Sequence, residues 1–378
     1  MRVLLTGGGT SGHVNPALAI ADIIRAREPD SEFAYIGTEK GIEKRLVEKE
    51  GIRFYPIKIQ GISRSLSPSN LRTAYLIMTA PTAAKKIIKE FHPDVVIGTG
   101  GYVCWAPLKA AAAMGIPTVI HESNSIPGLA VRKLEDKVDM ILTNFKSCAD
   151  RMKSSDKVIN VGNPIRVSFG ETDREAARRK LGIPDSAKFV ILSFGGSLGA
   201  PSLNSAAIEV MRRFGVEHED VMHFHAGGKK YYDNAMQMFA GYSLEKHPRL
   251  AVREYIYDMS LHMAAADIVI CRAGAMTLTE LSMMRKAAIL VPSPHVTDNH
   301  QYKNAKVLSD AGAAVLIEEG ETMADDVVAA VEHLYAEREL CHEMSERIAE
   351  FSNPDVDEEI YRQISRLVKN NAKIKRKT

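Results

Sequence analysis

Residues 4–24 read LLTGGGTSGHVNPALAIADII: an apolar strand runs through three consecutive glycines into an amphipathic helix. Glycines let main-chain N–H groups approach an anion, and the N-terminus of a helix adds partial positive charge. The stretch therefore predicts a phosphorylated ligand. It matches a dinucleotide site poorly, because Gly37 and Thr38 occupy the place where an acidic residue is expected after the second strand. A nicotinamide-dependent oxidoreductase is therefore the less favoured interpretation of this loop.

The opening unit recurs about half a chain later, where residues 189–204 read FVILSFGGSLGAPSLN. This is again a strand, a glycine-rich turn and the start of a helix. Throughout the chain, short runs of Val, Ile and Leu alternate with helical patterns. Strands are predicted at 2–6, 32–37, 94–100, 117–122, 139–143, 157–162, 188–196, 221–228, 267–274, 287–293 and 313–319.

Apolar strands that alternate with helices are typical of parallel sheets covered on both faces. A length of 378 residues favours two domains. We predict the α/β class, with two doubly wound Rossmann-like domains that face a cleft: residues 1–164 and residues 165–351, with a C-terminal helix at 352–378 that packs back on the first domain. The carboxyl ends of both sheets would line that cleft, where α/β folds bind ligands.

The composition is that of a soluble globular protein, with 45% hydrophobic and 25% charged residues. A net charge of +2 argues against bulk nucleic-acid binding. The four cysteines form no C-x-x-C pair, which predicts free thiols in a reducing cytoplasm. We expect neither a signal peptide nor a membrane span. The C-terminal KNNAKIKRKT is a small basic tail, interpreted as a solvated chain end.

Residues 267–284 read DIVICRAGAMTLTELSMM and place a helix N-terminus after a strand. Such a helix N-terminus is suited to binding a diphosphate. Glu280 is suited either to gripping two ribose hydroxyls or to complementing the helix dipole. Ser197 either donates to a phosphate oxygen or caps its helix. Arg166 is either a bidentate phosphate donor or an ordinary surface arginine.

In the first half, the strand end VIHESNSIPG at 119–128 carries His121, Glu122 and Asn124, polar groups suited to sugar hydroxyls. A buried, hydrogen-bonded His121 is the structural alternative. No Asp-x-Asp triplet falls at a strand end near these loops, and the one at 355–357 fits the start of a late helix. We therefore expect no metal ion and no other cofactor.

Seven ordered motifs, in a match that runs from Val3 to about Asn304, resemble the MurG family of bacterial glycosyltransferases. They are GGGTSGHVNPALA at 7–19, GTGGYV at 98–103, HESNSIPGLA at 121–130, GNPIR at 162–166, FGGSLGA at 194–200, CRAGAMTLTEL at 271–281 and DNHQYKNA at 298–305. The resemblance implies a two-domain fold of the GT-B type. It also implies an inverting hexosyl transfer of N-acetylglucosamine from UDP-N-acetylglucosamine to the C4 hydroxyl of lipid I, the lipid-linked muramyl-pentapeptide, forming lipid II for peptidoglycan synthesis at the cytoplasmic face of the cell membrane.

The resemblance implies binding roles in both halves. Residues on the phosphate side of the first domain are Thr10, Ser11 and Gly12, and Asn124 reaches toward the sugar. The donor diphosphate would be held by Arg166 and Ser197, and uracil by the main chain of Ile256. The nucleotide would be contacted by Ala275, Met276, Thr277, Leu278, Thr279 and Glu280. Of these, Glu280 would bind the ribose hydroxyls. Gln301 would form hydrogen bonds with the hydroxyls of the N-acetylglucosamine.

Two positions depart from the family pattern. Ser11 replaces a glycine, which narrows the backbone freedom of the first loop. His300 replaces the first of two glutamines, so its contact with the donor sugar is tentative. By the same resemblance, His13 is either the base that takes a proton from the acceptor hydroxyl or a group that positions a phosphate or caps the loop.

A membrane contact is also implied, because the acceptor is anchored in a bilayer. The candidate segment combines apolar residues with nearby cations: Leu71, Tyr75, Leu76, Ile77 and Met78 beside Lys85 and Lys86. The pattern alone favours an ordinary helix that faces the core and has a solvated basic end. An anionic membrane surface is the expected partner, and nucleic acid is not.

Three rival functions stay open at this point. A nicotinamide-dependent oxidoreductase explains the first glycine loop but not the second. A sugar-nucleotide-binding protein without activity would have no need of His13. A UDP-N-acetylglucosamine 2-epimerase or a glycolipid synthase would share the two-domain architecture, although the motifs at 121–130 and 298–305 favour the MurG family.

Overall fold

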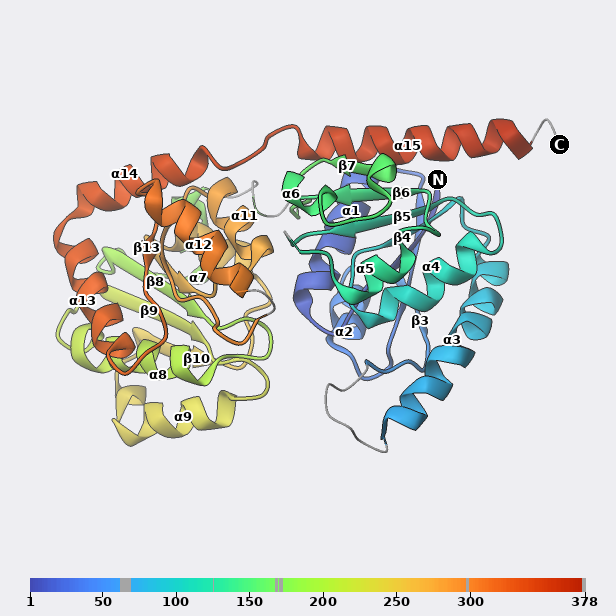
Figure 1. Cartoon of the computed structure of the whole chain (residues 1–378). Coiled ribbons are helices and arrows are strands. Elements are labelled where there is room, and N and C mark those ends of the chain that lie inside the picture. The colour runs from blue at the N-terminus through green and yellow to red at the C-terminus, as the bar shows by residue number, and fades with distance from the viewer. Residues whose placement is uncertain (62–68, 125, 167–168, 170–172, 297–298, 376–378) are drawn as a thin grey trace. The chain divides into compact units, whose positions relative to one another are not determined.

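The computed structural model describes residues 1–61, 69–124, 126–166, 169, 173–296 and 299–375. The chain divides into two compact units (Figure 1). Unit 1 comprises Met1–Val167 and Asn353–Thr378, and unit 2 comprises Ser168–Ser352. The divisions lie three residues after the predicted boundary at 164 and one residue after that at 351.

Unit 1 alternates strands with helices. Its strands are β1 (Arg2–Thr6), β2 (Glu32–Gly37), β3 (Arg53–Pro56), β4 (Val95–Gly98), β5 (Thr118–Glu122), β6 (Met140–Thr143) and β7 (Val158–Asn160). Its helices are α1 (Ser11–Arg27), α2 (Ile42–Lys49), α3 (Ser69–Phe91), α4 (Trp105–Ala112), α5 (Leu129–Leu134), α6 (Lys146–Ala149) and α15 (Val356–Lys375).

Unit 2 repeats this alternation. Its strands are β8 (Phe189–Phe194), β9 (Val221–Ala226), β10 (Leu250–Arg253), β11 (Ile268–Cys271), β12 (Ala287–Leu290) and β13 (Val315–Leu316). Its helices are α7 (Arg174–Leu181), α8 (Pro201–Val210), α9 (Tyr232–Gly241), α10 (Met259–Ala265), α11 (Ala275–Met283), α12 (His300–Asp310), α13 (Met323–Ala336) and α14 (Arg338–Ala349).

The described strands form one parallel sheet in each unit, ordered β3-β2-β1-β4-β5-β6-β7 and β10-β9-β8-β11-β12-β13. In unit 1, Leu5 of β1 lies opposite Tyr35 on one side and Ile97 on the other. The strand order reverses between β1 and β4 and again between β8 and β11. These are the switch points at which doubly wound sheets bind ligands, so the fold class is confirmed and the loops after these four strands become the places to examine.

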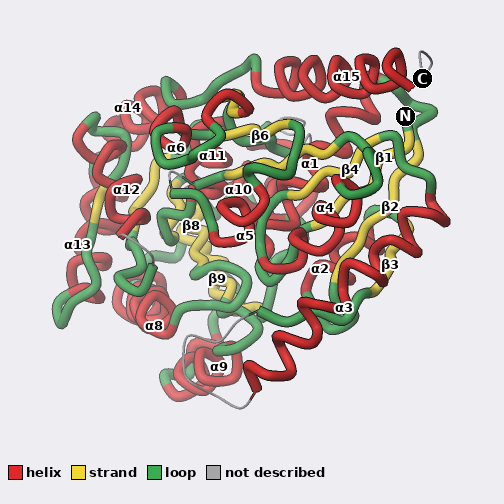
Figure 2. Tube along the Cα trace, turned by 45° about the vertical axis from the view of Figure 1, so that its right-hand side comes forward, coloured by secondary structure: helices red, strands yellow, loops and turns green. Residues whose placement is uncertain are grey.

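Two apolar layers sandwich the sheet of unit 1. One layer joins side chains of α3, α4 and α5, including Ile88, Leu108 and Val131, to the sheet. The other joins α1 and α2 to α15, and Ile360 and Ile364 of α15 are fully buried in it. In both views α15 runs alongside α1 (Figure 1 and Figure 2). Burying each such isoleucine contributes about 2 kcal/mol, which fixes the C-terminal helix to unit 1.

Two strands, β3 and β10, were not predicted, and both lie at the edge of a sheet. The sequences RFYP of β3 and LAVR of β10 have few fully buried side chains, because only one neighbouring strand flanks each of them. Their apolar residues therefore do not form the continuous runs that mark interior parallel strands. The eleven predicted strands are all present. All four cysteines carry free thiols, as predicted. No helix within the described ranges is both long and apolar enough to cross a membrane.

Candidate active site

The glycine loop after β1 lies directly against the loop after β4. The hydroxyl of Thr99 donates to the main-chain carbonyl of His13, and the Thr99 N–H donates to the carbonyl of Thr6. Gly101 has a φ of 73°, and a Cβ there would lie 2.1 Å from the carbonyl oxygen of Gly8. Only glycine permits this approach, so the two loops at the switch point form one rigid edge.

His13, half-buried at the start of α1, is held by this edge. Its Nδ1 lies 3.2 Å from the main-chain oxygen of Thr99. Because a carbonyl can only accept, Nδ1 carries the hydrogen in the neutral ring and Nε2 keeps its lone pair. Burial lowers the pKa of His13, while the negative charge of Glu122 acts in the opposite direction. The arrangement presents a neutral imidazole whose Nε2 can accept a proton.

The neighbours predicted on the phosphate side lie at the same helix start. Thr10 is the exposed N-cap residue of α1, and Ser11 and Gly12 follow as its first half-buried residues. Among the described residues, the Thr10 side chain caps no main-chain N–H of the helix. Ser11 is helical and is absent from the residues of positive φ, so the serine that replaces the family's glycine causes no backbone strain.

The polar cluster after β5 organises its own loop. Glu122 is buried, and its carboxylate accepts hydrogen bonds from the main-chain N–H and side-chain amide of Asn124, both at 2.9 Å, and from the N–H of Gly128 at 2.8 Å. His121 is fully buried with Nε2 at 2.9 Å from the Gly162 carbonyl oxygen, and burial lowers its pKa to about 4. Of the three residues, Asn124 alone is half-exposed, so its side chain is the one that a ligand can reach.

Arg166, predicted to bind the donor diphosphate, forms ion pairs with two carboxylates in the structure. Its Nε donates to the Asp22 carboxylate at 2.6 Å, and its Nη2 lies 2.7 Å from a carboxylate oxygen of Glu50. A guanidinium that faces two carboxylates is already compensated in charge, so this geometry does not favour a diphosphate contact. The pattern GNPIR gave no indication of these two acidic partners, which lie more than 100 residues earlier in the chain.

In unit 2, the glycine loop after β8 packs on the loop after β9. Gly199 and Gly228 both have positive φ, and a Cβ on Gly228 would lie 2.0 Å from the N atom of Gly199. The main-chain oxygen of Ser197 accepts a hydrogen bond from the N–H of Lys229 at 3.3 Å. The half-buried Ser197 hydroxyl has no hydrogen-bond partner among the described residues, so it is available to a ligand.

A buried hydrogen-bond chain beneath these loops was not predicted. The Asn204 amide donates to the carbonyl of Gly227 at 2.9 Å, and its oxygen faces Nε2 of His225 at 3.1 Å. The Ser193 hydroxyl bridges Nδ1 of His225 and Nε2 of His223 at 2.8 and 2.7 Å. The Asn204 side-chain oxygen can only accept a hydrogen bond. His223 therefore donates to Ser193, Ser193 to His225, His225 to Asn204, and Asn204 to the Gly227 carbonyl. Two histidines spaced by two residues in one strand were the available signal.

Asn204→Ala is expected to lower the free energy of unfolding by about 2–4 kcal/mol, because it leaves two buried polar groups unpaired. Urea denaturation of the purified variant measures this loss. The control is Ser205→Ala on the same helix, where the half-buried hydroxyl reaches only a methionine sulfur at 3.8 Å and the loss should stay near 0.5 kcal/mol. Equal losses in both variants would contradict the assignment.

The second switch-point loop of unit 2 leads into α11. Gly274 is its N-cap, and Ala275, Met276 and Thr277 form its first turn, at the positive end of the helix dipole. Leu278 is buried, and the Thr279 hydroxyl donates to the Ala275 carbonyl at 2.9 Å. The N-terminus of α11 therefore lies at the carboxyl end of β11, where the sequence placed it, and a helix N-terminus is suited to an anion.

Glu280 is only 8% exposed, and no hydrogen bond from another described residue reaches its carboxylate. Burial raises its pKa to about 8. An unpaired buried carboxylate is costly, so a ligand that donates two hydroxyl hydrogens would stabilise its charged form. The alternative, a carboxylate that merely complements the helix dipole, fits this residue poorly, because it lies in the second turn of α11 and is buried.

The raised pKa of Glu280 predicts the pH dependence of stability without ligand. The folded protein holds this proton more tightly than the unfolded chain, whose glutamates titrate near 4.5, so this contribution to stability is complete below that pH and is lost as pH rises toward about 8. We expect the melting temperature of Glu280→Gln, relative to that of the wild type, to rise between pH 5 and pH 8. Scanning calorimetry in matched buffers measures this difference. Parallel pH profiles would refute this.

The remaining predicted donor residues lie at neighbouring loops of unit 2. Ile256 is buried between β10 and α10, and its main-chain groups make no hydrogen bond to another described residue. Gln301 on α12 accepts a hydrogen bond from the N–H of Ser293 at 2.9 Å through its side-chain oxygen, which leaves its amide hydrogens directed elsewhere. His300 starts the same helix and is half-buried. Across the described ranges, no three His, Cys, Asp or Glu side chains are placed to hold a metal ion.

The candidate membrane segment is α3 of unit 1. Tyr75 and Met78 are 66% and 78% exposed, while Leu76 and Ile77 are half-buried. Lys85 and Lys86 are exposed toward the end of the helix. Leu71 belongs to α3, but its side chain lies outside the described part of the chain.

Comparison with known proteins also divides the chain into two domains. The model of the glycosyltransferase family 28 N-terminal domain matches residues 3–143, and that of the family 28 C-terminal domain matches residues 190–360. The chain belongs to glycosyltransferase family 28. Its two units thus correspond to the two domains of a family 28 enzyme, a hexosyltransferase.

Several relatives in family 28 match the chain from end to end. One from Acetivibrio thermocellus is 41% identical over 98% of this chain and 100% of its own length, and one from Leuconostoc citreum is 39% identical over 98% and 99%. Both are named UDP-N-acetylglucosamine–N-acetylmuramyl-(pentapeptide) pyrophosphoryl-undecaprenol N-acetylglucosamine transferase. The chain is therefore similar over its whole length to the enzymes that its motifs resemble.

Solved structures agree on the architecture. The crystal structure of MurG from Acinetobacter baumannii has a TM-score of 0.67 and 27% identity, and the match covers 97% of this chain and 99% of that one. A 2-epimerase from Listeria monocytogenes, described as putative, has a TM-score of 0.68 at 15% identity over 95% and 94% of the two chains. The latter match shows a shared fold alone.

Proposed function

We propose that this family 28 enzyme transfers N-acetylglucosamine from UDP-N-acetylglucosamine to lipid I, the undecaprenyl-linked muramyl-pentapeptide, and forms lipid II. The observation that carries the proposal is the end-to-end match to transferases named for this reaction. The geometry supports it with a base in unit 1 and an anion-binding helix beside an unpaired carboxylate in unit 2.

His13 acts as the base in this proposal. Its Nε2 takes the proton of the muramyl C4 hydroxyl as that oxygen forms a bond to the anomeric carbon, and the bond from this carbon to the UDP oxygen breaks. The attack comes from the side opposite the leaving group and inverts the anomeric centre. The hydrogen bond to Thr99 fixes the ring so that Nε2 remains unprotonated.

The donor-binding role falls to unit 2. Main-chain groups of Ile256 pair with uracil, Glu280 accepts two ribose hydroxyls, and Gln301 reads the sugar hydroxyls with His300 as a further contact. The hydroxyl of Ser197 and the N-terminus of α11 hold the diphosphate. Asn124 and residues 10–12 of unit 1 serve the sugar and the acceptor phosphate. Arg166 is left out, because its two carboxylate partners occupy it.

The proposal needs no metal ion or organic cofactor. Negative charge that develops on UDP is stabilised by main-chain N–H groups and a helix dipole, which are fixed before the reaction. We expect the rate to be unchanged when EDTA is added to the purified enzyme. A loss of activity that added divalent cations restore would overturn this part of the proposal.

The acceptor places the reaction at the cytoplasmic face of the membrane, to which the enzyme binds peripherally. In unit 1, exposed Tyr75 and Met78 form the apolar contact, and Lys85 and Lys86 face anionic head groups. The buried side of α3 meets the core through Ala84 and Ile88, so the exposed residues are not needed for folding.

The deciding experiment measures UDP release from UDP-N-acetylglucosamine with and without a short-chain lipid I analogue. We expect release that depends on the acceptor, together with a disaccharide product identified by mass spectrometry. Release without the acceptor, accompanied by formation of N-acetylmannosamine, would favour a 2-epimerase. Binding of the sugar nucleotide without turnover would indicate a protein that only binds it.

A further inference from the structure

The C-terminal segment of the chain is charged very differently from the remainder. Seven of the 49 basic side chains and none of the 47 acidic ones fall within residues 361–378, so the first 360 residues carry 42 basic against 47 acidic side chains. Its last ten residues, KNNAKIKRKT, were interpreted above as a solvated end. In the structure, most of it is ordered helix in α15.

The two sides of α15 differ in character. Val356, Ile360 and Ile364 are buried against unit 1, and the Tyr361 hydroxyl donates to Glu28 at the end of α1 at 2.9 Å. These contacts hold the helix in place and fix which side faces outward. The apolar side is therefore occupied, and the outer side is available only for polar contacts.

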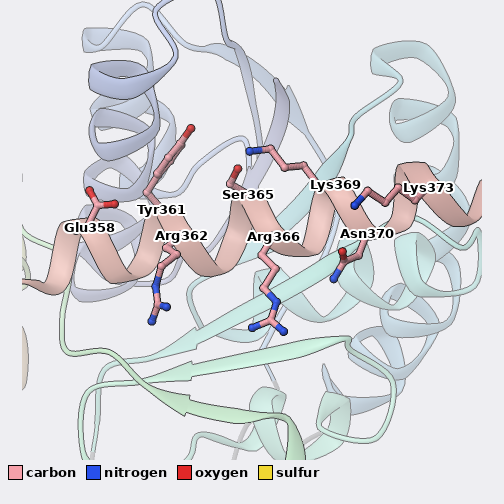
Figure 3. Close-up of a pocket in the computed structure, with 8 residues that line it drawn as sticks. All are labelled: Glu358, Tyr361, Arg362, Ser365, Arg366, Lys369, Asn370 and Lys373. Carbon is pink, nitrogen blue, oxygen red and sulfur yellow. The ribbon is translucent and has the colours of Figure 1, made fainter.

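A shallow groove of about 340 Å³ runs along the outer side (Figure 3). The residues that line it are Glu358, Tyr361, Arg362, Ser365, Arg366, Lys369, Asn370 and Lys373. Figure 3 shows Arg362 and Arg366 extending from the same side of the helix, with Lys369 and Lys373 on the following turns. The groove thus presents a row of cations over three turns.

Most of these cations lack a compensating charge. Arg362 is paired with Glu359, and Glu358 is paired with Arg27 of α1. Arg366, Lys369 and Lys373 are exposed, and none of them forms an ion pair with another described residue. Three uncompensated cations on one helix face produce a local positive potential on a molecule that is otherwise net negative.

We infer that the outer face of α15, through Arg366, Lys369 and Lys373, is a docking surface for an anionic phospholipid bilayer, separate from α3. The inference rests on the proposed function, which gives the enzyme a membrane-anchored acceptor. Each Lys or Arg held near an anionic lipid surface contributes about 1 kcal/mol to binding electrostatically, without insertion. Because the apolar side of α15 is buried in unit 1, this contact uses head groups alone.

A bilayer fits the surface better than a nucleic acid does. The cations occupy one short helix face rather than a path across the molecule, and the first 360 residues repel a long polyanion. The one aromatic side chain in the groove, Tyr361, has its hydroxyl bound to Glu28 and takes part in a cation–π contact with Arg27, so it offers no free platform for base stacking.

The test is co-sedimentation of the full chain with vesicles of phosphatidylcholine, with and without phosphatidylglycerol. We expect the triple variant R366E/K369E/K373E to partition onto anionic vesicles about 100-fold more weakly than the wild type. The matched control K180E/K188E/K246E has the same change in net charge at exposed lysines of unit 2 and should partition as the wild type does. Circular dichroism and UDP release with the short-chain acceptor check that both variants fold.

Each outcome decides the inference. Equal partition of the wild type and the α15 variant overturns it, as does equal binding of the wild type to neutral and anionic vesicles, which would assign the contact to apolar residues such as Tyr75 and Met78 rather than to cations. Displacement of the wild type by mixed-sequence RNA at the same phosphate concentration would indicate a general polyanion site instead. If the wild type fails to turn over the soluble acceptor, the proposed function fails, but the vesicle measurement still decides the role of α15.

Discussion

His13→Ala lowers kcat by about 10²- to 10⁴-fold with little change in the KM for UDP-N-acetylglucosamine, if the imidazole is the base that the structure supports. The reason is geometric: Nδ1 is committed to the Thr99 carbonyl at 3.2 Å, so the opposite nitrogen accepts the proton. Steady-state kinetics with a short-chain acceptor measure the effect. The wild-type kcat should also fall on the acid side of a pKa below 6.5, because burial lowers the pKa of His13.

His342→Ala is the matched control, since this histidine is exposed on α14. It should leave kcat and its pH profile unchanged. If His13 only positions a phosphate, its loss will raise the KM of the acceptor while the acid limb of the kcat profile persists. That pattern would remove His13 from the role of base and leave the transferase assignment standing.

Glu280→Ala is expected to raise the KM for UDP-N-acetylglucosamine by about 10- to 100-fold, with a smaller effect on kcat, because two charge-assisted hydrogen bonds to the ribose are lost. Since burial raises the pKa of the free carboxyl to about 8, donor binding must displace a proton near neutral pH. Isothermal titration with UDP in buffers of different ionisation enthalpy should detect this release. A donor affinity that Glu280→Ala leaves unchanged would show that the carboxylate does not bind the ribose.

The exposed Glu346→Ala is the control for the loss of one negative charge, and it should alter neither KM nor proton release. Glu280→Gln separates charge from shape, because the amide keeps an acceptor oxygen. It should bind UDP more weakly than the wild type and release no proton. Proton release that persists in Glu280→Gln would have to come from another group.

Interior strands could be predicted from the sequence because they are buried on both faces, and burial selects the continuous apolar runs that were recognised. Of the four edge strands among the described residues, β7 and β13 lie within predicted apolar runs, whereas RFYP of β3 and LAVR of β10 form no such run and were not predicted. The recurrence of strand, glycine turn and helix start was sufficient for two doubly wound units. In the structure, glycine pairs follow β1, β4 and β8, three of the four strands at the switch points.

The surroundings of a candidate site residue could be predicted where its own loop defines them and could not where a distant partner does. The helix N-terminus before Glu280 is local, and the structure has it as predicted. Arg166 depends on Asp22 and Glu50, whose proximity only the folded chain reveals. The chain of hydrogen bonds through Ser193 likewise joins residues of two strands and a helix, and no spacing rule connects them.

The return of α15 to unit 1 affects how the protein is made. A ribosome releases the chain from the N-terminus, so residues 1–167 emerge long before α15, and the whole of unit 2 is synthesised in between. Until then, the surface of unit 1 that receives Val356, Ile360 and Ile364 has no cover. The first unit to be synthesised is therefore the last to be completed, and a nascent chain that stalls within unit 2 exposes an apolar patch to chaperones and proteases.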